Sequence, residues 1–197
     1  MTAQRKLPPM MTVADFIEWP GDGTDTRYEL VDGELRAMAP GADSHNTIVA
    51  NLIGELWRHL REAGLPCRVV SAPGVQPRVR ANWNFRIPDV GVTCAPNKAG
   101  EVMTPEPVLL MEVLSPGNAQ DTYENVRANT TLPSVREIVI VHSTAVRAEL
   151  LVRDENGHWP PNATEIGAGG TLAFPSIGAV IPLSEVYAGT HLATGPA

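Results

Sequence analysis

The sequence has no apolar run near the roughly 20 residues that a membrane-spanning helix needs. The stretch from Met1 to Met11 also lacks the apolar core of a secretory signal peptide. These absences argue against an integral membrane protein and against a secreted one. We therefore expect a cytoplasmic protein with no membrane partner.

Cysteine is scarce too, because the chain has only Cys67 and Cys94. Neither belongs to a metal-binding or redox motif, and each lies in a strand-like apolar run. A free thiol in such a place behaves as a small hydrophobic side chain, and disulfides are rare in the cytoplasm. We expect two unpaired thiols that bind no metal.

Positive charge is in the minority, with 15 Lys and Arg against 22 Asp and Glu and a net charge of −7. General nucleic-acid binders gain much of their affinity by neutralising phosphates, so this balance argues against that class. Residues 58–86 are the exception, with six arginines against one acid, Glu62. They form either a local basic face or a set of arginines on the solvated edges of a helix and strands.

The remaining composition is that of an ordinary globular protein, with 43% hydrophobic and 19% charged residues. A length of 197 residues suits one domain with a proper core and is short for two. We predict a single domain over residues 11–190, with a flexible tail at 1–10 and a second tail at 191–197.

Local signals predict three elements before residue 64. Thr12 offers an N-cap for a short helix, and Asp32-Gly33 between two alternating runs predicts a β-hairpin over residues 27–38. A long helix is expected from a cap at Asp43 or Ser44 to about Ala63, before Gly64. Its apolar stripe consists of Ile48, Leu52, Leu56 and Leu60.

Apolar runs typical of strands follow at 67–71, 75–79, 87–94, 108–114, 135–142 and 147–152. Residues 121–131 are compatible with a helix between the fourth and fifth runs. This order predicts an α/β fold, in which helices pack on a mixed sheet of the α+β kind. From Pro160 onward we expect a weakly patterned tail, with a short docking helix within 181–187.

Two carboxylates stand out among the predicted strands. Alternation along residues 87–94 turns Asp89 away from the apolar side chains of Val90 and Val92. Glu112 interrupts a run that is otherwise as apolar as a buried strand. Because a buried carboxylate without a partner is costly, either an oxygen-loving Mg²⁺ or Mn²⁺ ion compensates the charge, or an arginine such as Arg86 does.

His45 has helical spacing to Val49, Leu52 and Leu56, which places it on the inward stripe of the long helix. It could reach a site beside the sheet. The alternative is a hydrogen-bonded core histidine with no role in chemistry.

A set of ordered motifs carries a family resemblance. The chain resembles the bacterial Uma-two family of restriction endonucleases, within the PD-(D/E)XK superfamily, over about residues 11–190. The resemblance rests on Met11-Thr-Val-Ala-Asp-Phe, Arg27-Tyr-Glu-Leu-Val-Asp-Gly-Glu-Leu, Pro40 to His45, Pro88-Asp89, Glu112-Val-Leu-Ser-Pro116, Asp121 and Pro133-Ser-Val-Arg-Glu137.

The resemblance implies a restriction-endonuclease-like core in which Asp89, Glu112 and the backbone carbonyl of Val113 bind Mg²⁺ or Mn²⁺. It also implies that Glu29 and His45 approach this site. The reaction would be hydrolysis of DNA phosphodiester bonds, for which the metal activates a water and stabilises charge on the phosphate. A two-fold homodimer would suit cleavage of both strands.

The sequence departs from the superfamily pattern at the lysine. The position two residues after the second acid holds Leu114, and the position that matches a lysine in the next helix holds Asn125. An amide can donate hydrogen bonds but contributes no charge. The sequence therefore leaves three readings: a weak endonuclease, a catalytically degenerate module that binds nucleic acid or protein, and a purely structural set of ion-paired acids.

Overall fold

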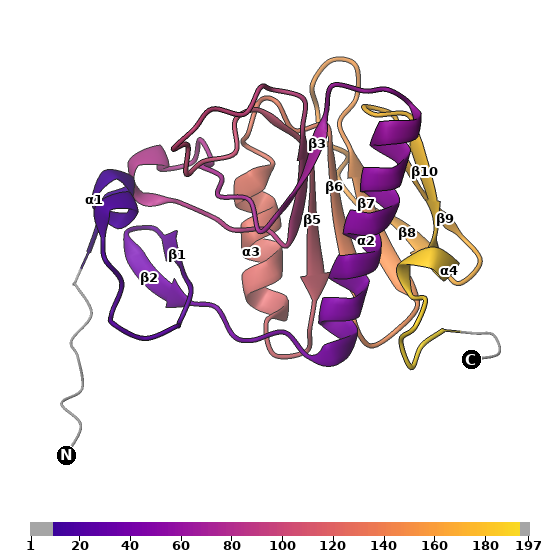
Figure 1. The fold of residues 1–197 in the computed structure, drawn as a ribbon, viewed down its shortest axis with the longest axis horizontal. Coiled ribbons are helices and arrows are strands. Elements are labelled where there is room, and N and C mark those ends of the chain that lie inside the picture. The colour runs from indigo at the N-terminus through magenta and orange to yellow at the C-terminus, as the bar shows by residue number, and fades with distance from the viewer. Residues whose placement is uncertain (1–9, 194–197) are drawn as a thin grey trace.

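The computed structural model describes residues 10–193, which form a mixed sheet covered by helices on both faces (Figure 1). The six strands of this sheet lie in the order β3-β4-β5-β6-β7-β8. Only the β5 and β6 pair is parallel, and the other neighbours are antiparallel. Their bounds are β3 (Arg68–Ser71), β4 (Val90–Thr93), β5 (Pro107–Leu114), β6 (Glu137–His142), β7 (Arg147–Val152) and β8 (Thr164–Gly167). The predicted α/β class with a mixed sheet is confirmed.

Helix α3 (Ala119–Asn129) connects β5 to β6, since parallel neighbours need a crossover between them. Its Val126 packs on one face of the sheet, against Leu110 of β5 and Ile138 of β6. Alternation puts Glu112 on the same strand face as Leu110 and Leu114. The side chain of Glu112 therefore lies on the side that α3 covers.

Helix α2 (Asp43–Glu62) covers the opposite face of the sheet (Figure 1). Its predicted apolar stripe is buried against Met111 and Val113. Neither Asp43 nor Ser44 caps the helix, because Ala42 is the N-cap and no side chain caps it, so that detail of the prediction is wrong. Gly64, with φ of +62°, follows the end of the helix as expected.

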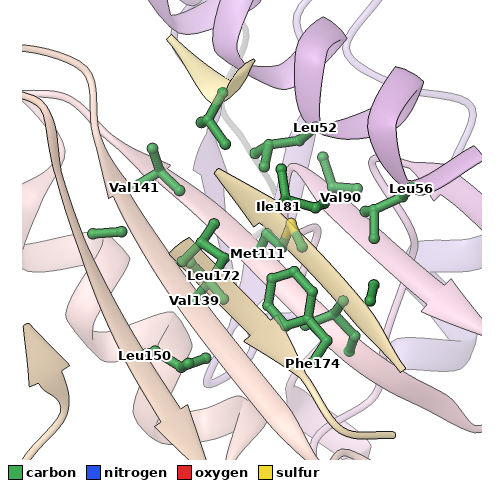
Figure 2. Close-up of a cluster of buried hydrophobic side chains, with 14 of the residues drawn as sticks. Leu52, Leu56, Val90, Met111, Val139, Val141, Leu150, Leu172, Phe174 and Ile181 are labelled. Carbon is green, nitrogen blue, oxygen red and sulfur yellow. The ribbon is translucent and has the colours of Figure 1, made fainter. Parts of the chain in front are cut away.

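The segment after residue 160 is more ordered than its weak pattern predicts. Strands β9 (Thr171–Phe174) and β10 (Ala179–Pro182) form a hairpin, followed by the short helix α4 (Leu183–Val186). Figure 2 shows Leu172, Phe174 and Ile181 among the side chains of the main core. The short docking helix is confirmed, whereas the sequence does not predict the hairpin that precedes it.

The N-terminal elements form a smaller unit beside α3. They are α1 (Val13–Glu18), β1 (Tyr28–Val31) and β2 (Glu34–Ala37). Thr12 caps α1, and Asp32 and Gly33 both have positive φ in the hairpin turn, as predicted. Leu30 of β1 pairs with Phe85 through two backbone hydrogen bonds. This pairing brings Glu29 beside Arg86.

Two predicted strands are shorter than expected or absent. Residues 75–79 form no strand, and within them only Val75 makes a bridge, to Arg86. Pro77 and Pro88 both lack the backbone N–H that strand pairing requires. Strand β4 therefore starts at Val90, and Asp89 lies immediately before it.

The expectation of free thiols is wrong, because Cys67 and Cys94 form a disulfide. The β3 and β4 register pairs Arg68 with Thr93, which makes the two cysteines the next facing pair along the strands. Their Cα atoms are 3.9 Å apart.

Within residues 10–193 no helix is long and apolar enough to cross a bilayer. The predicted tails lie mostly outside the described residues.

Candidate active site

Asp89 lies immediately before β4, and Glu112 lies in the neighbouring strand β5. The β4 and β5 register pairs Val90 with Met111, so Asp89 lies opposite Glu112 one step further along. The Oδ2 atom of Asp89 accepts a hydrogen bond of 2.7 Å from the backbone N–H of Val113. The structure therefore brings these two sequence-predicted carboxylates together.

Glu112 is a buried acid whose charge is poorly compensated. Its side chain is almost fully enclosed, and no described residue donates a hydrogen bond to Oε1. Burial raises its pKa well above 4.5, and the negative charges of Asp89 and Glu29 raise it further. Asn125 and Arg86 oppose this rise. The carboxyl group either holds a proton or needs a nearby cation.

His45 reaches Asp89 from the first turn of α2. Its Nε2 atom lies 3.4 Å from Oδ2 of Asp89. This contact raises the pKa of His45 above 6.5 despite burial, and the backbone of Val113 contributes in the same direction. Gly41 leaves the room that the ring occupies, because a Cβ there would lie 2.6 Å from Nδ1 of His45.

Glu29 enters the site from strand β1 and is also buried. Both of its carboxylate oxygens accept hydrogen bonds from Nδ2 of Asn125, at 3.3 and 3.2 Å. Burial raises the pKa of Glu29, while the positive charges of Arg86 and Arg36 lower it. Glu29 and Asn125 therefore belong to the same polar cluster as Glu112.

Two arginines complete the cluster. The sequence predicts Arg86 only as an alternative partner of Glu112, and it does not predict Arg36 at this site. Arg86 is buried, and its Nη1 atom donates to Oδ1 of Asn125 at 3.1 Å. Arg36 lies nearer to solvent, where it forms ion pairs with Asp121 at 3.2 Å and Glu124 at 2.7 Å. The position of Arg36 could have been predicted from the sequence, because the Asp32-Gly33 turn sets a register that pairs Arg36 with Glu29.

Lys98 and several arginines of residues 58–86 make their contacts outside the cluster. Lys98 is exposed and pairs with Glu101, while Leu114 is buried in the apolar layer under α3. The arginines of residues 58–86 are spread over different elements. Arg58 pairs with Glu55 and Glu62, Arg61 lies over Trp57, Arg68 binds the carbonyl of Ala95, and Arg80 pairs with Asp32. This distribution favours solvated edges over one basic face.

The donor set suits a sparsely ligated hard cation. In residues 10–193 no group of three or more His, Cys, Asp or Glu side chains is arranged to enclose a metal ion. Mg²⁺, however, is commonly bound through one or two carboxylates, with water and substrate phosphate as the other ligands. The unpartnered Oε1 of Glu112 opposite Asp89 fits that kind of site.

The chain is similar to known proteins in sequence and in fold. The chain is 27% identical over 184 residues to the uncharacterized protein slr1290 of Synechocystis sp. (strain ATCC 27184 / PCC 6803 / Kazusa), covering 92% of this chain and 93% of that protein. Its fold is similar, with a TM-score of 0.69 and 12% identity, to a crystal structure described as a "putative nuclease belonging to DUF820" from Anabaena variabilis ATCC 29413. That match covers 90% of this chain and 97% of the other.

A family model supplies the assignment. The Uma2 model, described as "Putative restriction endonuclease", matches residues 13–180. The match spans every residue of the cluster, from Glu29 to Asn125. The chain belongs to the Uma2 family and has the restriction-endonuclease-like fold that its motifs predict.

Proposed function

We propose that this chain is a Mg²⁺- or Mn²⁺-dependent endonuclease that hydrolyses DNA phosphodiester bonds. The observation that carries the proposal is the buried Glu112, with an unpartnered carboxylate oxygen, opposite Asp89. A buried anion of this kind is costly unless a cation or a proton joins it. Membership in the Uma2 family supports a nuclease among the proteins that would use such a site.

In this proposal Asp89, Glu112 and the carbonyl of Val113 hold the metal ion. The ion supplies an activated water and neutralises charge on the scissile phosphate. The residues of the chain do the positioning. The N–H of Val113 and Nε2 of His45 hold the Asp89 carboxylate, and His45 is suited to take or give a proton at Nε2.

Glu29 and Asn125 form the second part of the proposed machinery. The Asn125 amide donates to Glu29 and interacts with Glu112. These contacts keep the two buried carboxyl groups in fixed positions. Cleavage of both DNA strands would suit a homodimer, which remains a prediction.

A second candidate function is a binding module that kept the fold and lost catalysis. Two observations favour it: Leu114 is buried in an apolar layer, and Asn125 is a neutral amide where the superfamily pattern has a lysine. The net charge of −7 also gives little electrostatic attraction for DNA.

An assay on supercoiled plasmid and on single-stranded DNA, with Mg²⁺ and separately with Mn²⁺, tests the proposal. The natural chain should cleave slowly, and the Asp89→Ala variant should not cleave at all. A metal-independent rate, or equal rates for the two proteins, would indicate a contaminating nuclease and remove the support for catalysis. Binding of DNA without cleavage at any metal concentration would favour the second candidate.

A further inference from the structure

We propose that Arg86 and Asn125 act as one cationic unit, in which Arg86 is a positioning residue that turns the N–H groups of Asn125 toward the buried carboxylates. In this pair the charge of Arg86 strengthens the positive N–H end of the Asn125 amide, which points toward the carboxylates. The consequence for DNA cleavage rests on the proposed function, whereas the geometry of the pair is independent of it.

The orientation of the Asn125 amide follows from donor and acceptor chemistry. A guanidinium group has only donors, and an ionised carboxylate has only acceptors. Nη1 of Arg86 lies 3.1 Å from one end of the amide, and the carboxylate of Glu29 lies 3.2 to 3.3 Å from the other. Only one orientation satisfies both neighbours, with Oδ1 toward Arg86 and Nδ2 toward Glu29.

Arg86 is itself held in place on several sides. Its Nη2 atom donates to Oδ1 of Asn84 at 2.9 Å, and Asn84 in turn donates to Asp32. Its backbone forms two hydrogen bonds with Val75. Arg86 is only 4% exposed, so its side chain cannot turn out to solvent without breaking this network. A fixed arginine suits an orienting role.

The charge of Arg86 reaches the carboxylates through the amide. Nη1 of Arg86 lies 3.9 Å from Oε1 of Glu29, a direct but long ion pair. The amide between them is polarised by the guanidinium, because hydrogen bonds in a chain strengthen one another inside a protein. Donation from Asn125 to Glu29 and Glu112 is therefore stronger than that of an isolated amide.

This arrangement predicts the effect of the substitution Asn125→Lys. A lysine at residue 125 would place an ammonium group next to the buried guanidinium of Arg86, and like charges in such a place repel. The substitution should therefore be harmful in the natural chain. It should become tolerable once Arg86 is replaced by methionine, which is neutral and unbranched.

A double-mutant cycle tests the pair with four proteins: the natural chain, Arg86→Met, Asn125→Lys and the double variant. Thermal unfolding is measured without metal or DNA, and cleavage is measured separately with Mn²⁺. The double variant should unfold at a higher temperature than Asn125→Lys. It should also cleave at least about tenfold faster than Asn125→Lys, a coupling in the range of contacting side chains. Arg153→Met, which removes an arginine that binds Thr130 and Leu132 carbonyls, is the matched control and should show no coupling to Asn125→Lys.

The two readouts separate this inference from the proposed function. Coupling in the unfolding temperature without cleavage by any variant would support the pair and contradict the endonuclease. Cleavage that depends on Asp89, together with additive unfolding temperatures, would support the endonuclease and overturn the pair.

Nuclear magnetic resonance on the natural chain keeps the inference testable if Arg86→Met does not fold. The side-chain amide protons of Asn125 should exchange slowly with solvent and remain distinct, because both ends of the amide are hydrogen-bonded. Arg86→Lys should keep part of this protection, since lysine retains a charged donor. Rapid exchange in the natural chain, similar to that of an exposed asparagine, would overturn the proposed orientation.

Discussion

The Asp89 carboxylate accepts the backbone N–H of Val113 at 2.7 Å, and Val113 is the residue directly after Glu112. This single bond joins the segment before β4 to the C-terminal end of β5. The relative position of the two acids is therefore set by this bond and by the pairing of β4 with β5, which is more rigid than a free loop. His45 adds a second contact to the same oxygen of Asp89.

Replacement of Glu112 by glutamine should stabilise the metal-free protein at neutral pH. The pKa values of Glu112 and Glu29 are raised in the folded state, so the folded chain binds more protons than the unfolded chain above pH 4.5. Stability of the natural chain should therefore fall as pH rises through the raised pKa values. Glu112→Gln should flatten this fall and add about 1 to 3 kcal/mol at pH 8.

Urea denaturation between pH 5 and pH 8 measures this effect. Glu62→Gln is the matched control, because Glu62 is an exposed glutamate on α2 whose neutralisation should change little. A natural chain that is equally stable at both ends of this range would contradict the account of Glu112.

Replacement of His45 by alanine should lower the rate of DNA cleavage about a hundredfold, the lower range for loss of a group that transfers protons. The unfolding temperature should change little.

The pKa of His45 is raised by Asp89, so its ion pair stabilises the fold below pH 6.5 and is lost as pH rises through the raised value. The exposed His158, replaced by alanine, is the control. A collapse of stability in His45→Ala would make the residue structural.

The disulfide between Cys67 and Cys94 should be detectable in protein prepared without reductant, as the absence of reactive thiols after denaturation. The bond closes a loop between residues 27 positions apart. Reduction, or the double replacement by serine, should therefore lower the free energy of unfolding by about 2 to 4 kcal/mol. Two reactive thiols in the untreated protein would restore the original expectation of free cysteines.

The β9 and β10 hairpin should matter for stability, although its sequence pattern is weak. Phe174 is completely buried in the main core, so Phe174→Ala should cost about 3 to 5 kcal/mol in chemical denaturation. Val180 on the neighbouring strand is 64% exposed, and Val180→Ala should cost less than about 0.5 kcal/mol. Equal losses would mean that the hairpin does not pack on the sheet.

Elements with strong local signals could be predicted from the sequence, and those that depend on long-range pairing could not. The Asp32-Gly33 turn and the apolar stripe of α2 are encoded by neighbouring residues, as is the alternation that separates Glu112 from Met111. The strand from Thr171 to Phe174 has only four residues, too few to distinguish its alternation from chance, although the alternation is present.

The acids of the candidate site could be predicted from the sequence more firmly than its cations. Glu112 stands out because a charge in an apolar run needs an explanation wherever the strand lies. Arg86 stands out far less, because its position beside Asn125 depends on the backbone pairing of Leu30 with Phe85, 55 residues apart in the chain. The pairing of Cys67 with Cys94 likewise depends on the register of β3 with β4.

The most direct test of the account is a crystal structure of the natural chain grown with Mn²⁺, with anomalous diffraction recorded to locate the ion. One strong anomalous peak is expected between the carboxylates of Asp89 and Glu112, at about 2.1 Å from their oxygens, the distance typical of a small hard cation. The peak should be absent in crystals of Glu112→Gln. Crystals that contain no peak between these two residues, or that have Mn²⁺ only at another site, would contradict the central claim.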